Sequence, residues 1–456
     1  MKTTVSINPF TGEEIERFQN HSSQEVETFL QVSAQQFKEW KNTPLKQRAS
    51  LVLKVGEVLK SKKEIFAKTI TMEMGKPISQ SLAEIEKCAW LCEYYAAQAE
   101  AQLKDILIQT DADKSYVTHE PLGVILAIMP WNYPYWQVFR FAIPSLLAGN
   151  VAVLKHASNV FGCALQMEGL FLESGFPAFC FKTLLIGSEL VEKVIENPVI
   201  KAVTLTGSGP AGASVASIAG KNIKKTVLEL GGSNALVVFK DCAIEKTIHT
   251  IVNARFQNTG QSCIAGKRLL IDAAIHDKFL SKLSQKIKEL KSGDPMEKDT
   301  YIGTLAREDL ATELDKQVQK SLQMGATLVL GGKRQRAYYE PTLVSGVTPT
   351  MPLFNEETFG PALSVTSFDT EEEAIRLSNL SKFGLGVSLF SEDISRMEQL
   401  VPRFEEGAVF INELVKSDPR LPFGGIKQSG YGRELSAQGI KEFVNVKTVY
   451  IKKSPS

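Results

Sequence analysis

Short apolar strands alternate with helical segments through the middle of the chain, and no other pattern in the sequence restricts the fold as strongly. Apolar runs typical of buried strands lie at 122–129, 150–154, 202–205 and 226–230, and segments with helical periodicity separate them. A helix between two strands lets both strands run in the same direction within one sheet. The alternation therefore predicts an α/β fold built on a parallel sheet.

The segments on either side of this region differ from it. From Ser23 to about Leu103, apolar residues recur at three- and four-residue spacing, which predicts an α-rich N-terminal part. After Gly232 a second set of strands and helices begins, with strands near 235–239 and 267–271. Because a chain of 456 residues exceeds the size at which one hydrophobic core stops growing, we expect more than one domain.

Charge and cysteine content exclude several classes of function. The 52 Lys and Arg residues nearly balance the 51 Asp and Glu residues, so we expect neither nucleic acid nor a membrane as partner. No apolar run is long enough to span a membrane, and the first residues lack the hydrophobic stretch of a signal peptide, which favours a cytoplasmic protein. The six cysteines are scattered, so we predict neither a disulfide framework nor a bound metal.

One cysteine stands apart because of its position. Cys263 ends the polar, small-residue turn 257–263, and a more regular segment at 248–256 precedes it, so its thiol is predicted to be presented rather than packed. Glu229 lies near the end of an apolar strand, just before two glycines. A thiol becomes a strong nucleophile when a base or a positive potential lowers the cost of ionising it. Cys263 and Glu229 are therefore candidates for a nucleophile and its base.

A glycine-rich turn offers a competing interpretation of Glu229. Residues 207–212 satisfy the pattern G-x-G-x-x-G between the strand at 202–205 and a helix predicted for 211–219. Backbone N–H groups at such a helix N-terminus favour a pyrophosphate. In that motif an acidic residue about 20 positions further on binds a ribose, and Glu229 falls there. The pattern alone leaves Glu229 open as a base or as a ribose ligand.

Seven short motifs follow one another along the chain. They are Met129-Pro130-Trp131-Asn132-Tyr133-Pro134, Leu154-Lys155, Leu205-Thr206-Gly207-Ser208, Leu228-Glu229-Leu230-Gly231-Gly232, Gly260-Gln261-Ser262-Cys263, Glu356-Glu357-Thr358-Phe359-Gly360-Pro361 and Pro422-Phe423-Gly424-Gly425. In order and approximate spacing they resemble the NAD(P)-dependent aldehyde dehydrogenase superfamily over essentially the whole chain. Segments 154–157 and 430–436 are most similar to its succinate-semialdehyde dehydrogenase branch.

The resemblance implies the aldehyde dehydrogenase fold, with a Rossmann-like cofactor domain, an α/β catalytic domain and a small β oligomerisation element. The implied ranges are 1–105 and 122–231 for the NAD(P)-binding domain, 232–425 for the catalytic domain with the nucleophilic cysteine, and 106–121 and 436–456 for the oligomerisation hairpin and terminal strand. It also implies that the protein assembles as a homodimer or homotetramer.

The resemblance implies a covalent mechanism. Cys263 attacks the aldehyde carbonyl to form a thiohemiacetal, which loses a hydride to the nicotinamide and becomes a thioester. Glu229 is implied as the base that activates the thiol and the hydrolytic water, and its apolar flanks predict a raised pKa. Asn132 is implied as an amide donor to the oxyanion, beside the backbone N–H of Cys263.

The family's cofactor contacts also map onto this chain. They are Pro130, Trp131, Lys155, Ser158, Gly207, Ser208, Leu230, Glu357 and Phe359. NAD-selective members often have glutamate at the position of Ser158, where a carboxylate would repel a 2′-phosphate. Ser158 beside Lys155 favours that phosphate instead. We therefore expect NADP as the cofactor, with NAD as the alternative.

The expected reaction is the oxidation of succinate semialdehyde to succinate. The distal carboxylate of this substrate requires a cation, and we expect Arg140, in a helix predicted for 139–147, to meet it together with the hydroxyl of Ser417. Gln257 departs from a subgroup that has arginine at its position. A dehydrogenase for another short aldehyde, such as glutarate semialdehyde, and a thiol acyl transferase or esterase without hydride transfer are the alternatives.

Overall fold

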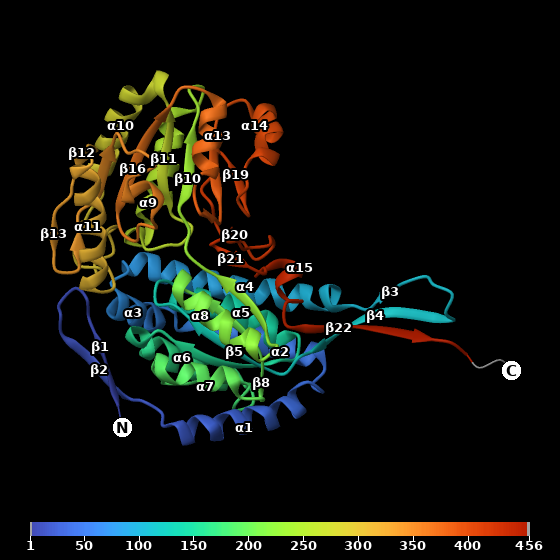
Figure 1. Cartoon of the computed structure of the whole chain (residues 1–456). Coiled ribbons are helices and arrows are strands. Elements are labelled where there is room, and N and C mark those ends of the chain that lie inside the picture. Colours follow the sequence, from blue (N-terminus) through green and yellow to red (C-terminus); the bar gives the residue numbers. More distant parts are fainter. Residues whose placement is uncertain (1, 454–456) are drawn as a thin grey trace.

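Four helices dominate the N-terminal part of the computed structural model, which describes residues 2–453 (Figure 1). They are α1 (Ser23–Trp40), α2 (Leu45–Ser61), α3 (Lys63–Met74) and α4 (Ile78–Leu103), and the hairpin β1 (Thr3–Ile7) and β2 (Glu14–Gln19) precedes them. Helix α1 starts with a capping box, in which Ser22 and Glu25 each accept a backbone N–H of the other. The α-rich N-terminal part is therefore confirmed.

The first large sheet has six strands in the order β21-β9-β8-β5-β6-β7. Their bounds are β5 (Val124–Met129), β6 (Val151–His156), β7 (Phe181–Thr183), β8 (Ile200–Thr206), β9 (Lys225–Glu229) and β21 (Gly430–Tyr431). All neighbours run parallel except β21, which returns from far along the chain to pair antiparallel with β9. Glu229 ends β9 opposite Thr206 of β8. It therefore lies at the carboxyl edge of the sheet, where ligand sites of α/β proteins form.

Helices connect the parallel strands, as the alternation predicted. They are α5 (Pro134–Leu147), α6 (Phe161–Glu173), α7 (Val191–Glu196) and α8 (Gly209–Lys221). Helix α5 begins at Pro134, earlier than the predicted 139, because Glu84 of α4 accepts hydrogen bonds from the N–H groups of Tyr135 at 2.9 Å and Trp136 at 3.0 Å. These N–H groups have no partner within the helix, and a carboxylate at a helix N-terminus is favoured.

The second large sheet has seven strands in the order β12-β15-β16-β11-β10-β18-β19. Their bounds are β10 (Asn234–Val238), β11 (Gly266–Asp272), β12 (Thr327–Leu330), β15 (Thr342–Ser345), β16 (Ala362–Phe368), β18 (Val387–Phe390) and β19 (Val409–Ile411). The main helices beside it are α9 (Ile244–Phe256), α10 (His276–Lys288), α11 (Glu308–Gln323), α13 (Glu371–Asn379) and α14 (Ile394–Leu400) (Figure 1). Only the β12–β15 pair is antiparallel, so the second α/β set is confirmed.

Alternate residues of β10 face the two cores of this second sheet. Ala235 and Val237 belong to one buried cluster, and Leu236 and Val238 belong to the other. This is the two-residue period of a strand covered on both faces. A separate, larger core surrounds the first sheet. Within residues 2–453, no helix combines the length and the apolar character that crossing a membrane requires.

A third, antiparallel sheet projects from the body of the molecule (Figure 1). Its order is β22-β4-β3, formed by β3 (Ile106–Leu107), β4 (Lys114–Pro121) and β22 (Val444–Ile451). We refer to these three strands as the arm. The register between β4 and β22 runs without a break from Val444 opposite Pro121 to Ile451 opposite Lys114. The arm unites the two segments expected to form the oligomerisation element, whose function in assembly stays a prediction, as do the domain boundaries.

Candidate active site

The turn that carries Cys263 has an unusual backbone. After α9 ends, Asn258 and Thr259 adopt φ values of 55° and 52°, within the short helix η3 (Gln257–Gly260). Residues other than glycine rarely adopt this left-handed region, so surrounding contacts must hold the backbone in this conformation. The Asn258 amide supplies such contacts, donating to the carbonyl of Asn132 at 2.9 Å and to that of Gln261 at 3.1 Å. Cys263 is partly exposed, as predicted, and the other five cysteines are buried, but Cys263 also packs against the core of the first sheet.

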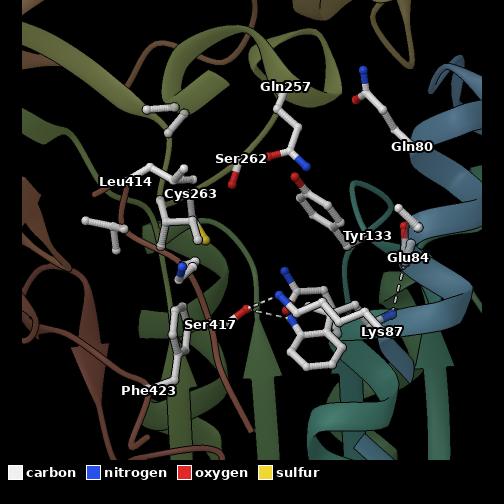
Figure 2. Close-up of a pocket in the computed structure, with 18 of the residues that line it drawn as sticks. Gln80, Glu84, Lys87, Tyr133, Gln257, Ser262, Cys263, Leu414, Ser417 and Phe423 are labelled. Carbon is white, nitrogen blue, oxygen red and sulfur yellow. Dashed lines mark hydrogen bonds between the residues drawn. The ribbon is translucent and has the colours of Figure 1, made fainter. Parts of the chain in front are cut away.

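Cys263 lines two cavities. The first, which we call the Glu357 cavity, contains seven of the nine predicted cofactor residues, Pro130, Trp131, Gly207, Ser208, Leu230, Glu357 and Phe359, together with Asn132. The second, which we call the Ser417 cavity, contains the two predicted substrate residues, Arg140 and Ser417. Figure 2 shows Ser417 and Cys263 in this cavity. The candidate nucleophile therefore borders both predicted ligand sites.

The two remaining cofactor candidates lie outside the Glu357 cavity. Ser158 begins the short helix η1 (Ser158–Val160) and lines a neighbouring cavity, and Arg307 borders both spaces. Lys155 is half-buried near the end of β6. Burial lowers the pKa of its ammonium group, and the charge of Glu189 acts in the opposite direction. Ser158 thus lines the neighbouring cavity, and Lys155 lines neither of the two.

The Glu357 cavity has the features of a dinucleotide site. Ser208 caps α8, accepting the N–H of Ala211 at 3.4 Å, so the positive end of that helix faces the Gly207 turn. The carboxylate of Glu357 accepts the N–H of Gly232 at 2.9 Å. A Cβ on Gly231 would clash with this carboxylate, so a larger residue there would displace the Glu357 side chain. These residues fit a bound pyrophosphate and ribose.

Glu229 is buried without a hydrogen-bond partner. Only 2% of the residue is exposed, and neither carboxyl oxygen has a partner among residues 2–453. Burial raises its pKa well above the usual value, the charge of Glu434 raises it further, and Arg140 and Arg433 lower it. The raised pKa agrees with the apolar flanks of β9. Burial is the main cause of the raised pKa of the Cys263 thiol, and a negative charge on Glu229 adds a smaller increase.

Glu434, which sequence reasoning assigned no role, forms a buried ion pair with Arg140. The Nε atom of Arg140 lies 2.8 Å from Oε2 of Glu434, although the contact is not aligned as a hydrogen bond. The guanidinium also lies 4.5 Å from the centre of the Phe423 ring. Arg140 therefore lines the Ser417 cavity as predicted, but its charge is already compensated. The only sequence signal for Glu434 was its place within the family-like segment 430–436.

Lys267 is a second residue that sequence reasoning missed. Its buried ammonium lies 2.7 Å from the Glu357 carboxylate and donates to the carbonyl of Cys263 at 3.3 Å. It thereby connects the nucleophile turn to the wall of the Glu357 cavity. No motif marked this lysine, because its partner Glu357 is distant in the sequence.

Asn132 lies beside the Cys263 turn. Its side-chain amide donates to the carbonyl of Gln261 at 3.1 Å, which leaves its second amide hydrogen available. Within residues 2–453, the structure gives the backbone N–H of Cys263 no partner. The loop before α5 is held by a buried ion pair between Lys76 and Glu84, and the Lys76 ammonium lies 3.9 Å from the centre of the Tyr133 ring. Two donors are therefore held near the thiol, as an oxyanion requires.

The electrostatics of the site predict how its thiol reacts. Burial raises the pKa of Cys263 to about 11, although Arg140 and Lys267 lower it. At pH 7 about one thiol in 10⁴ is then ionised, and this fraction rises about tenfold with each pH unit. We expect alkylation of Cys263 by iodoacetamide, without cofactor, to accelerate accordingly from pH 7 to 9. Peptide mass spectrometry measures the rate, and a plateau below about pH 9 would contradict the raised pKa.

The comparisons with known proteins agree with this geometry. A sequence model described as the aldehyde dehydrogenase family matches residues 1–449, so the chain belongs to the aldehyde dehydrogenase family and the resemblance is confirmed. Among similar curated proteins is the probable succinate-semialdehyde dehydrogenase (NADP+) of Synechocystis sp., which is 46% identical over 98% of this chain and 99% of the relative. Succinate-semialdehyde dehydrogenase (NADP+) 1 of Mycobacterium tuberculosis is 43% identical over 98% of this chain and 99% of the relative.

Solved structures confirm the aldehyde dehydrogenase fold. The succinic semialdehyde dehydrogenase of Streptococcus pyogenes in complex with NADP+ superposes with a TM-score of 0.96 at 35% identity, covering 99% of this chain and 100% of that one. The protein Gox0499, described in terms of cofactor and substrate selection, gives a TM-score of 0.97 at 37% identity, with the same coverage.

Proposed function

We propose that this enzyme oxidises succinate semialdehyde to succinate with NADP. The observation that carries the proposal is that Cys263 lines both a cavity suited to a dinucleotide and a cavity lined by Arg140 and Ser417. The Nη2 atom of Arg140 is buried without a hydrogen-bond partner among residues 2–453, which supports a further acceptor such as a carboxylate. The names of the relatives at 43–46% identity support the same substrate and cofactor.

In the proposed reaction, the Cys263 thiolate adds to the aldehyde carbon, and the carbonyl oxygen becomes an oxyanion. The backbone N–H of Cys263 and the free amide hydrogen of Asn132 donate to this oxygen. Gly207, Ser208 and Glu357 of the Glu357 cavity would hold NADP, which would supply the hydride acceptor. A thioester then remains on Cys263. Glu229 takes a proton from water, which attacks the thioester and releases the carboxylate. In balance, aldehyde, water and NADP+ give carboxylate, NADPH and two protons.

The raised pKa of Glu229 suits this role. A carboxylate with an ordinary pKa is a weak base near neutrality, whereas one in an apolar site binds a proton more strongly. Glu229 has no hydrogen-bond partner among residues 2–453 that would stabilise its charged form. Its proximity to Glu434 favours the protonated form as well. Once ionised, Glu229 is therefore a strong proton acceptor for a water molecule.

Cofactor choice is tested at Ser158. We expect Ser158→Glu to lower the ratio of kcat/KM for NADP over NAD by about 10²-fold, because a carboxylate facing a 2′-phosphate costs several kcal/mol. Steady-state assays with each cofactor measure the ratio. Ser158→Gln is the matched control, because it has similar bulk and no charge, and its ratio should stay closer to the wild-type value. A ratio unchanged in Ser158→Glu would contradict the role of Ser158.

The substrate is tested by crossing aldehydes with cofactors. Purified enzyme is assayed for NADPH or NADH formation with succinate semialdehyde, glutarate semialdehyde and butanal. We expect the highest kcat/KM for succinate semialdehyde with NADP. A preference for the longer semialdehyde would favour the alternative dehydrogenase. Thioester turnover without reduced cofactor would favour an acyl transferase or esterase.

We also propose that the protein is a homodimer or homotetramer assembled through the arm. Leu107 of β3 is 73% exposed and Val446 of β22 is 60% exposed, so the arm presents apolar side chains to solvent. Its outer strands also carry unpaired backbone groups, which readily accept a strand from another chain. Light scattering of the full chain and of a Leu107→Glu, Val446→Glu variant tests this, and an unchanged mass would contradict assembly through the arm.

A further inference from the structure

Lys87 reaches the Ser417 cavity from helix α4. The residues of α4 that line this cavity, Gln80, Ala83, Glu84 and Lys87, recur at three- and four-residue spacing and form one face of the helix. Figure 2 shows the Lys87 side chain extending to Ser417, whose Oγ atom accepts a hydrogen bond from the ammonium at 3.0 Å. The ammonium also lies 4.2 Å from the centre of the Trp136 ring. A mostly buried cation thus stands at the cavity wall.

This cation has no carboxylate partner among residues 2–453. The acidic groups around it are already engaged: Glu84 pairs with Lys76 and caps α5, and Asp418 binds Arg420 at 2.6 Å. Arg140 and Lys416, the other cations of the cavity, pair with Glu434 and Glu413 respectively. Removing a charge from water is costly unless it is paired. The unpaired ammonium therefore favours an anion supplied by a ligand.

Ser417 adds a second donor beside Lys87. Its Oγ atom accepts from Lys87 at 3.0 Å, as a dashed line of Figure 2 marks, and from the indole N–H of Trp136 at 2.9 Å. A hydroxyl has two acceptor positions, and these two bonds use both. Its own hydrogen must then point elsewhere, as a donor. The ammonium of Lys87 and the hydroxyl of Ser417 thus present adjacent donors to the cavity that reaches Cys263.

We propose that Lys87, with Ser417, is the specificity determinant that binds the distal carboxylate of the semialdehyde. The inference rests on the proposed function and adds a residue to it. Arg140 remains beside the carboxylate, but Glu434 compensates its charge. A four-carbon substrate with an anionic end then gains an ion pair with Lys87 that an uncharged aldehyde of equal length cannot form.

The proposal predicts a pH signature. Burial lowers the pKa of Lys87 to about 8, and Arg140 of α5 acts in the same direction. Cys88 and Glu84 of α4 and Asp418 of the loop before Phe423 raise it. Because the neutral amine cannot attract a carboxylate, we expect the ratio of kcat/KM for succinate semialdehyde over butanal to fall above pH 8, by up to about tenfold per unit. Ionisation of Cys263 affects the oxidation of both aldehydes equally, so it cancels in this ratio.

The test compares Lys87→Met with the wild type, using NADP and both aldehydes. We expect kcat/KM for succinate semialdehyde to fall about 10- to 100-fold, mainly through KM, the size of effect that loss of a charged hydrogen bond produces. Butanal oxidation should change little, which also shows that the variant is folded. Lys87→Arg should recover part of the selectivity because it restores the charge. Lys60→Met is the control. Lys60 lies on α2 and forms an exposed ion pair with Glu93 of α4, away from the cavity.

The outcomes separate the two proposals. If the wild type oxidises butanal as efficiently as succinate semialdehyde, the proposed function fails. If the wild type prefers the semialdehyde and Lys87→Met retains that preference, the role of Lys87 is overturned and the function stands. If Lys87→Met does not fold, the wild-type pH profile decides, because a selectivity ratio that stays constant through pH 8 to 9.5 overturns the proposal.

Discussion

Replacing Cys263 by serine is expected to abolish aldehyde oxidation, with kcat lower by at least about 10⁴-fold. A hydroxyl in this buried site ionises far less readily than a thiol and does not form the thioester. Because residues other than Cys263 form most of the lining of the Glu357 cavity, NADP binding should persist. Activity assays and NADP titration by fluorescence measure the two effects.

A matched control exists for this substitution. Cys242 is the most exposed of the five buried cysteines, at 8%, and belongs to the core beside the second sheet rather than to either cavity. Cys242→Ser should therefore keep kcat within about twofold, as expected for a change away from the reacting atoms. Substantial NADPH formation by Cys263→Ser would contradict the role of Cys263.

Replacing Glu229 by glutamine is expected to slow the steady state by about 10²- to 10⁴-fold, because thioester hydrolysis loses its base. If acylation is less affected, NADPH appears in an initial burst that approaches one equivalent per chain, followed by slow turnover. Stopped-flow absorbance resolves the two phases. A variant that turns over at the wild-type rate would contradict the assignment of Glu229.

The same substitution has a predicted effect on stability. A glutamate whose pKa is raised in the folded state binds a proton more tightly there than when unfolded, so its contribution to stability is lost as pH rises above the unfolded pKa of about 4.3. Glutamine has no such penalty. We expect Glu229→Gln to melt at or above the wild-type temperature at pH 8. Reduced activity in this variant would then not reflect unfolding.

Local patterns in the sequence predicted the two α/β sets, the helical N-terminal part and the segments that form the arm. Periodicity reports burial, and each of these elements buries one or both faces. The start of α5 was placed too late, at 139, because the carboxylate that caps its N-terminus belongs to Glu84 on another helix. Contacts between distant residues leave no local signal.

In the candidate site, too, residues within local motifs were predicted and residues that depend on distant contacts were not. The motifs indicated Cys263, Glu229 and Asn132 as candidates, and the fold brings the Asn132 and Cys263 segments together. Lys87, Lys267 and Glu434 were missed, since each depends on a partner far along the chain. A lysine on a helix is usually solvated, and only the folded structure shows that Lys87 is mostly buried against Ser417.

The central claim, that Cys263 carries the acyl group during NADP-linked oxidation of succinate semialdehyde, has a direct test. Glu229→Gln is incubated with succinate semialdehyde and NADP, quenched in acid and examined by intact-mass and peptide mass spectrometry. We predict one succinyl group per chain, attached to Cys263, with an equal amount of NADPH, and no stable adduct when NADP is omitted. NADPH formation without acylation of Cys263, or acylation at another residue, would contradict the claim.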